Sequence, residues 1–484
     1  MLTVCSKRIV MSRKLLLVNP VNPDRIGLNV NPSGRFPPLG LGVVAALTPS
    51  GWNIQIHDEN FEPFRYEEVD LVGISSFTSQ ITRAYEIARF YREKGIPTVI
   101  GGIHASMLPE EALKYADTVV VGEAESTWPK LIEDFENGKL RRVYREDRLA
   151  KSIISGARHD LFHPKYILGS IQTARGCPMD CNFCSVTTFN GGQYRQRDIK
   201  DVLDELETIP QPLVYFVDDN LYGYGKHAAE RAITLFEGIV QRGIQKQWFS
   251  QSSINFADSE AVVASAAKSG CRMILLGVEA ENDTALKDAG KKLNIKFLDR
   301  FATVFRRINR HGIAVLGSFI YGMEHDTIKG MRDRTRYILN SEIDAMQISL
   351  MTPLPGTRLF RQLQDQGRLF FTDFPKDWAR YDMTEVVFKP LMMTPEELYA
   401  GFCEAGMTLY NHATLCYKYI ETLRNTRDLK TAGWAYNVNL NYHKAATGVF
   451  LQRNWPFLNQ LGEPLRRAFH GMIGLRGPSR FVRW

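Results

Sequence analysis

The sequence predicts an α/β protein in which a doubly wound, Rossmann-like domain precedes a partial (β/α)6 barrel and a mainly helical C-terminal region. Two observations predict this fold class. Short apolar runs alternate with helix-like stretches over residues 14–140, and the alternation resumes over residues 165–365. Short apolar strands that alternate with helices are typical of parallel sheets with both faces covered. After residue 369 the pattern changes to aromatic-rich and then helix-like segments.

The composition limits the size and the location of the protein. A length of 484 residues suggests roughly three domains, and a hydrophobic content of 44% is ordinary for packed cores. The first residues lack a long apolar run, and no stretch reaches the roughly 18 uncharged apolar residues of a membrane span. We therefore expect a cytoplasmic, reducing location. The seven cysteines are odd in number and sparse, so disulfides are not expected.

Four segments are expected along the chain. The Rossmann-like domain covers residues 1–140, a charged linker 141–164, the barrel 165–370 and the helical region 371–484. The last 43 residues, 442–484, hold seven Lys or Arg and one acid, Glu463, with Trp and Phe interleaved. Such a tail suits peripheral contact with an anionic membrane surface. The alternative is a solvated basic face whose aromatic side chains pack on the barrel. Nothing resembles an RNA-binding module, so no nucleic-acid partner is expected.

Five strands are predicted in the first domain, and they end in small or polar residues. The strands cover residues 15–19, 54–58, 71–76, 98–102 and 118–122, with helices over 39–47 and 81–94. Ligands of such sheets bind at the carboxyl ends of the strands. Those ends include Ser75, Ser76, Gly101 and Gly102, followed by Gly122. Small residues there let a large ligand lie against the backbone.

Six strands are predicted in the barrel, and their C-terminal ends are polar. The strands cover residues 166–176, 213–217, 247–253, 273–279, 314–321 and 345–350. Functional residues of such barrels gather at these ends. The candidates are Asp218, Asp219, Asn220, Gln251, Ser252, Glu279 and Gly317. The Asp-Asp-Asn run suits a positively charged amine, and it equally suits the cap of a following helix.

Three cysteines stand in eight residues, at Cys177, Cys181 and Cys184. Thiolates hold the irons of iron–sulfur clusters, and this spacing suits a short loop around one. Three thiolates for a cube of four irons would leave one iron open for a small molecule. Zinc is the alternative, but a structural zinc site has four ligands and no Cys or His follows closely.

The cysteine loop resembles that of the radical S-adenosylmethionine (SAM) superfamily, because it follows a predicted strand and has the aromatic Phe183 before its last cysteine. The resemblance implies a [4Fe–4S] cluster held by the three cysteines, with SAM chelating the open iron. It also implies that residues 218–220 receive the methionine ammonium group and that the strand at Gly317 lies against adenine. An external electron donor such as flavodoxin or ferredoxin is implied as a partner.

The first domain resembles the cobalamin-binding domain of class B radical SAM proteins. The resemblance rests on Gly73-Ile-Ser-Ser-Phe77, Gly101-Gly-Ile-His-Ala-Ser106 and Val121-Gly-Glu-Ala-Glu125. It implies that the nucleotide tail of cobalamin lies beside Ser75, Ser76 and the two glycines. The Asp-x-His-x-x-Gly signature is absent, so the sequence names no lower cobalt ligand. The alternative is a domain that has kept this shape and binds nothing.

The order of the segments is similar to that in relatives of the hopanoid C-2 methylases over residues 14–410. This resemblance implies a 5′-deoxyadenosyl radical that abstracts hydrogen from an unactivated carbon, and cobalamin-dependent C-methylation of an apolar small molecule, a lipid or pigment. One alternative is radical chemistry without methyl transfer, namely cyclisation, oxidation or rearrangement. Another is a non-catalytic iron–sulfur or zinc interaction protein. The sequence predicts no catalytic residue beyond the cluster ligands.

Overall fold

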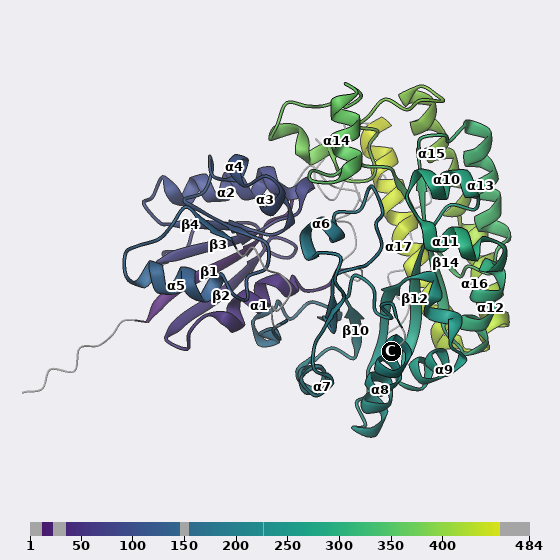
Figure 1. Ribbon diagram of the computed structural model, residues 1–484, viewed down its shortest axis with the longest axis horizontal. Helices are drawn as coiled ribbons and strands as arrows, with labels where there is room; N and C mark the ends of the chain where they lie inside the picture. The colour runs from purple at the N-terminus through teal and green to yellow at the C-terminus, as the bar shows by residue number, and fades with distance from the viewer. Residues whose placement is uncertain (1–11, 23–34, 146–153, 226, 455–484) are drawn as a thin grey trace, which may run out of the picture.

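The structure is a computed structural model that describes residues 12–22, 35–145, 154–225 and 227–454, with side chains described to residue 447. It has two parallel sheets side by side, joined by the C-terminal region (Figure 1). This arrangement confirms the predicted fold class. Residues 455–484 of the basic, aromatic tail lie outside the described residues, while residues 442–454 form the end of the last described helix. None of the described helices is both long enough and apolar enough to cross a membrane.

The first sheet is parallel and has six strands in the order β2-β1-β3-β4-β5-β6. The strands are β1 (Arg13–Asn19), β2 (Trp52–Asp58), β3 (Leu71–Ser75), β4 (Thr98–Gly101), β5 (Thr118–Val121) and β6 (Val143–Arg145). Alternate side chains of β1 point to opposite faces, as the pleat requires. Leu15 and Leu17 pack against the helices α1 (Leu39–Leu47) and α5 (Trp128–Glu136). Leu16 and Val18 pack against α2 (Ile81–Arg92).

Strand β6 was not predicted, and it lies in the segment expected to be a linker. It extends the first sheet by pairing with β5, and Tyr144 at its centre is buried against the α5 core. The strand has three residues between charged neighbours, which gives no recognisable alternation of apolar and polar residues.

The second sheet is also parallel, in the order β14-β13-β12-β11-β10-β7, and it is open between β14 and β7. Its strands are β7 (Leu168–Ile171), β10 (Leu213–Phe216), β11 (Gln247–Ser252), β12 (Cys271–Glu279), β13 (Ala314–Tyr321) and β14 (Ala345–Leu350). These six strands confirm the partial barrel. The predicted first strand is interrupted after β7, and β8 (Ala174–Arg175) instead pairs antiparallel with β9 (Arg195–Gln196).

The C-terminal region contacts both the barrel and the first domain. The helices α15 (Pro395–Leu409), α16 (His412–Thr426) and α17 (Leu429–Asn454) follow one another, and α17 packs across β12, β13 and β14 (Figure 1). Before them, residues 369–388 form a segment that we call the strap. Its Trp378 is buried in the core of the first domain, and the indole nitrogen donates a hydrogen bond to Glu111 (3.0 Å to Oε2). The strap therefore fastens the barrel to the first domain.

Candidate functional site

A cavity of about 630 Å³ lies between the first sheet and the barrel. One wall is the carboxyl edge of β3, β4 and β5, and the opposite wall includes Asp219 and the residues that follow the last cysteine. The strap contributes Tyr381, Asp382 and Met383. The cavity is therefore lined by residues of the Rossmann-like domain, the barrel and the C-terminal region, and helix α6 (Val186–Asn190) lies between the sheets beside it (Figure 1).

The predicted edge residues Ser75, Ser76, Gly101 and Gly102 all line this cavity. Gly102 has φ +92°, and a Cβ there would lie 2.9 Å from the backbone nitrogen and oxygen of Ser76. Only glycine fits such a position without strain. At Gly101 a Cβ would meet Val120 at an ordinary 3.7 Å. The edge presents backbone and small side chains, so its shape fits a large flat ligand such as a corrinoid.

Apolar side chains form much of the remaining cavity wall. Phe36, Pro37 and Pro38 approach from the segment before α1, while Phe189 and Leu354 approach from the barrel. The sequence analysis did not identify any of these five residues as part of a site. Pockets that are mostly apolar with a few polar groups are typical of sites for small molecules and cofactors.

The cysteine loop is held by backbone contacts from two neighbouring segments. The Asn182 side chain donates a hydrogen bond to the carbonyl of Asp288 (2.6 Å), and the Asn182 amide donates to Ala289 (3.3 Å). Gly290 lets this turn approach, since a Cβ there would lie 3.0 Å from the carbonyl oxygen of Asp180. Arg358 of α14 (Arg358–Asp365) pairs with the Asp180 carboxylate at 2.7 Å. These contacts hold the loop against the segment at Ala289 and against the start of α14.

Burial raises the pKa of all three loop cysteines, and that of Cys184 reaches about 12. Burial disfavours the thiolate form, so bound cations would be needed to hold the three sulfurs deprotonated. Within the described ranges, no three His, Cys, Asp or Glu side chains converge on a point where one metal ion could bind. A cube of irons is held differently, because each thiolate binds a separate iron. The loop therefore fits a cluster.

Asp218 is fully buried and its carboxylate binds the turn between β7 and β8. It accepts hydrogen bonds from the backbone amides of Thr173 (2.6 Å) and Ala174 (3.1 Å) and from the Thr173 hydroxyl. Burial raises the pKa of Asp218 to about 6 against these hydrogen bonds. In the same way the Asn220 oxygen accepts from Ser252 and from the Ser253 amide, which joins the ends of β10 and β11. These polar groups stabilise the strand ends.

Asp219 is the member of the Asp-Asp-Asn run that lines the cavity. Its Oδ2 accepts hydrogen bonds from the Gly176 amide (2.9 Å) and from the Asn190 side chain (2.8 Å). Gly176 directly precedes Cys177. Asp219 thus joins the cavity wall to the start of the cysteine loop.

Glu279 adopts a left-handed conformation (φ +66°) and its Oε1 lies 2.8 Å from Nζ of Lys291. Burial would lower the pKa of Lys291, but Glu279 and the nearby Cys181 outweigh burial and raise it. A buried cation therefore lies beside the cysteine loop, and the sequence analysis did not identify it.

The other predicted residues lie at the barrel: Phe183 packs on its core, Gln251 is half-buried in β11, and Gly317 packs against Ile343.

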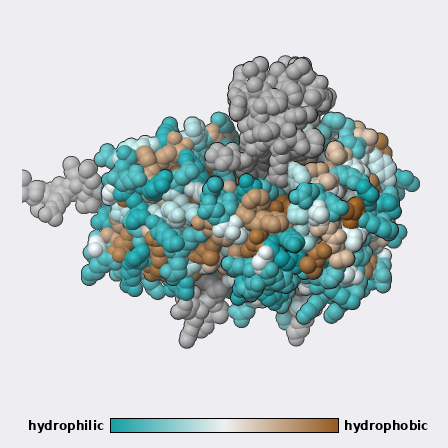
Figure 2. All heavy atoms as spheres, turned by 90° about the horizontal axis from the view of Figure 1, so that it is seen from above, coloured by the Kyte–Doolittle hydropathy of each residue, from teal (hydrophilic) through white to brown (hydrophobic). Residues whose placement is uncertain are grey.

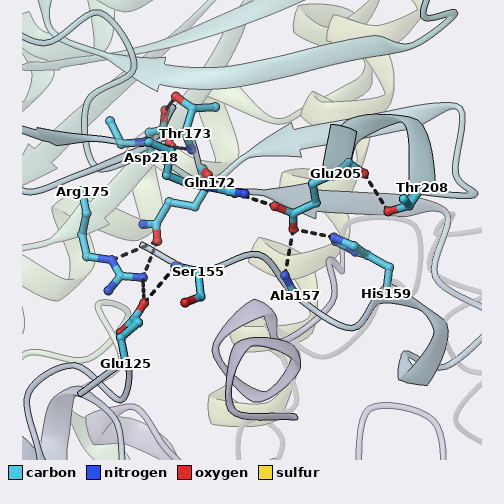
Figure 3. Close-up of polar contacts among 12 residues, drawn as sticks. Glu125, Ser155, Ala157, His159, Gln172, Thr173, Arg175, Glu205, Thr208 and Asp218 are labelled. Atoms are coloured by element: carbon cyan, nitrogen blue, oxygen red, sulfur yellow. Dashed lines mark hydrogen bonds and ion pairs between the residues drawn. The ribbon is translucent and has the colours of Figure 1, made fainter. Parts of the chain in front are cut away.

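A cluster of buried ion pairs crosses from the first domain to the barrel. Glu123 and Glu125, after β5, pair with Arg175 at 3.0 Å each, and Glu123 also pairs with Arg195. Figure 3 shows Arg175 between Glu125 and Gln172. The side-chain oxygen of Gln172 accepts a hydrogen bond from the Arg175 guanidinium at 2.9 Å. The sequence analysis quoted both glutamates as part of a resemblance and assigned them no partner.

Comparisons with known proteins agree with this architecture. Residues 26–132 match the B12 binding domain family, and residues 171–338 match the radical SAM superfamily. The bacteriochlorophyllide d C-12(1)-methyltransferase of Chlorobaculum tepidum is 30% identical over 83% of this chain and 88% of its own. The hopanoid C-2 methylase of Rhodopseudomonas palustris is 30% identical over 75% of this chain and 72% of its own. The cobalamin-dependent SAM radical enzyme OxsB shares the fold, with a TM-score of 0.66, 14% identity and coverage of 96% and 76%.

Proposed function

Because the chain belongs to the family of radical SAM methyltransferases with a B12 binding domain, we propose that it methylates an unactivated carbon of an apolar small molecule. The observation that carries the proposal is the cavity between the two sheets. One wall is the glycine-rich edge where a corrinoid would lie, and the opposite wall adjoins the cysteine loop. A substrate placed between them would meet both reactive centres.

Each group of residues has a proposed binding role. Cys177, Cys181 and Cys184 would hold the [4Fe–4S] cluster. Ser75, Ser76, Gly101 and Gly102 would lie along cobalamin. For SAM the proposed residues are Phe183, Asp218, Asp219, Asn220, Gln251, Ser252, Glu279 and Gly317. Of the Asp-Asp-Asn run, Asp219 is the one that lines the cavity, so it is the best placed to accept from an ammonium group.

When bound, the cluster and SAM supply a carbon-centred radical, and cobalamin supplies the methyl group. The protein positions these groups and keeps water away. Phe36, Phe189 and Leu354 line the cavity with apolar surface, and with ligands bound they would help to exclude water, which protects a radical from side reactions. Lys291 places a positive charge beside the cysteine loop, where it stabilises the thiolate forms of Cys181 and Cys184. The hydrogen bond from the Gly176 amide to Asp219 holds the start of the cysteine loop next to the cavity wall.

The test is an anaerobic assay that counts SAM products. Protein reconstituted with iron, sulfide and cobalamin is mixed with SAM and candidate lipids or cyclic tetrapyrroles, with either dithionite or flavodoxin and its reductase as donor. One methylation should consume two SAM molecules and yield equal amounts of 5′-deoxyadenosine and S-adenosylhomocysteine. Formation of 5′-deoxyadenosine alone, with an unmethylated product, would replace this proposal by radical chemistry without methyl transfer.

We also propose that the protein makes peripheral contact with a membrane. An apolar substrate hardly dissolves in water, so the enzyme would have to meet it there. On the face in Figure 2, hydrophobic residues form small groups among hydrophilic ones, so the described surface there offers no broad apolar area. The basic, aromatic tail is the segment proposed to reach the membrane. Each basic residue near an anionic surface contributes about 1 kcal/mol.

We expect the full-length protein to float with anionic liposomes at low salt, and a chain ending before Tyr442 to stay in the soluble fraction. Neutral liposomes are the control, because the attraction is electrostatic and should vanish with them. If neither protein floats at low salt, the tail has no membrane role, and a water-soluble substrate becomes the better proposal.

A further inference from the structure

We propose that Glu123 and Glu125 are positioning residues that hold the cysteine loop in a fixed place against the first domain. This inference rests on the proposed function, since it concerns how the cluster site is placed relative to the corrinoid site. Neither glutamate is assigned a bond to a cofactor. Their action runs through Arg175 and Arg195, which belong to the barrel.

The ion pairs connect two different parts of the fold. Glu123 and Glu125 follow β5 and line the cavity with Arg175. Oε2 of Glu123 lies 3.0 Å from Arg175 and 2.8 Å from Arg195, and Oε1 makes a further contact with Arg195. Oε1 of Glu125 lies 3.0 Å from Arg175. The Glu123 carboxylate therefore binds two guanidinium groups, and Glu125 binds one of them, that of Arg175 (Figure 3).

The two arginines stand at the two ends of the segment that contains the cysteines. Arg175 lies in β8 and Arg195 in β9, and they are directly opposite in the antiparallel pair. Residues 176–194, with all three cysteines, form the connection between them. A carboxylate that binds both arginines therefore holds both ends of the cysteine loop.

A chain of hydrogen bonds continues from Arg195 into the loop. Its guanidinium donates to the carbonyl of Asn190 (3.0 Å), and the Asn190 amide donates to Asp219 (2.8 Å). Asp219 in turn accepts from the Gly176 amide, one residue before Cys177. The links run through the Arg195, Asn190 and Asp219 side chains and through backbone groups of Asn190 and Gly176. A displacement of Glu123 would therefore reach the first cysteine.

The burial of these four ion-paired side chains indicates that they position the cysteine loop and do not merely attach the barrel to the first domain. The side chains of Glu123, Glu125, Arg175 and Arg195 are 4%, 6%, 11% and 10% exposed. Buried ion pairs are costly to desolvate, and apolar side chains of similar size would attach two domains at least as well. Two-pronged contacts between Arg and carboxylate add geometric specificity that apolar contacts lack. The strap already supplies an apolar attachment through Trp378.

The test compares Glu123→Gln with Glu133→Gln in the full-length protein. Glu133 is an exposed residue of α5 in the same domain, so it is a matched control. Amide hydrogen exchange of residues 176–194 should rise several-fold in Glu123→Gln and stay at the wild-type level in the control. In reconstituted protein, the reduction potential of the cluster should shift to a more positive value. Reduction adds negative charge, and loss of the carboxylate leaves two arginines less compensated.

Arg195→Lys is the second variant, should Glu123→Gln not fold. Lysine keeps the charge and loses the forked contact, so loop exchange should rise by a smaller factor. Loop exchange and cluster potential that stay at wild-type values in the folded variants would overturn the inference. Failure of the proposed function gives a different result: the wild-type protein would then methylate no substrate or take up no cluster or corrinoid, while hydrogen exchange would still report on the loop.

Discussion

Replacement of Cys177, Cys181 and Cys184 together by alanine should abolish both iron binding and SAM cleavage. The wild-type protein should hold about four irons per chain after anaerobic reconstitution, because each thiolate binds a separate iron of the cube. Without its three thiolates the loop keeps no anionic sulfur ligand, and the described neighbours provide no alternative group of metal-binding side chains. Iron content and 5′-deoxyadenosine release measure the two effects, and both should fall to the level of protein-free controls.

The matched control is the double replacement of Cys403 and Cys416 by alanine. These cysteines belong to the C-terminal helices α15 and α16, and they do not line the cavity. Iron content and SAM cleavage should remain as in the wild type. A triple variant that still holds a full cluster would refute the assignment of the cysteine loop. A wild-type protein that binds zinc and never cleaves SAM would favour the interaction-protein alternative.

The parallel sheets could be predicted because their strands are short, apolar and regularly spaced. Buried runs such as Leu15–Val18 and Met273–Leu276 pack against helices on both faces, so they remain apolar throughout. The cysteine spacing and the glycine pair at β4 are local signals and could be found in the same way. Strand β6 could not, because its stability comes from pairing with β5 and from the burial of Tyr144.

The polar contacts around the site could not be predicted, because they join segments that lie far apart in the chain. Glu123 and Arg195 are 72 residues apart, and Glu111 and Trp378 are 267 apart. Nothing in the Gly-Glu-Ala-Glu sequence around Glu123 predicts which residue pairs with its carboxylate. In the sequence, Lys291 lies with Asp288 and Lys292 in a charged stretch that is typical of a surface turn. Only the fold places Lys291 beside the cysteines.

The Asp-Asp-Asn run shows why a correct location does not fix a role. All three residues follow β10, at the predicted end of the barrel strand. Asp218 binds the turn after β7, Asn220 binds the end of β11, and Asp219 lines the cavity. Successive side chains after a strand point in different directions, so one position of three faces the ligand site. The interpretation as a helix cap is wrong, because the following helix α8 (Ala228–Gln241) begins at Ala228 and has His227 at its N-cap. The amine site stays a prediction, and Asp219 is the member of the run that lines the cavity.

Gly101→Leu should weaken corrinoid binding strongly while leaving the fold intact. Gly101 lines the cavity at the carboxyl end of β4, and a Cβ there makes an ordinary 3.7 Å contact with Val120. The backbone therefore tolerates a side chain, whereas Gly102, with φ +92°, does not. A leucine at this edge would occupy space that the corrinoid needs. Overpacking costs about 1–3 kcal/mol, which corresponds to a loss of affinity of about 5- to 150-fold.

Corrinoid absorption after titration with cobalamin measures this affinity, and Gly101→Ala should give a smaller loss in the same direction. Gly51→Leu is the control, because Gly51 lies in an exposed turn of the first domain with no atom within 4 Å of a Cβ. Its thermal midpoint and corrinoid affinity should match those of the wild type. Undiminished binding by Gly101→Leu would place the corrinoid away from this edge. A wild-type protein that binds no corrinoid would remove the basis for methyl transfer, because the glycine-rich edge would then be a retained shape without a ligand.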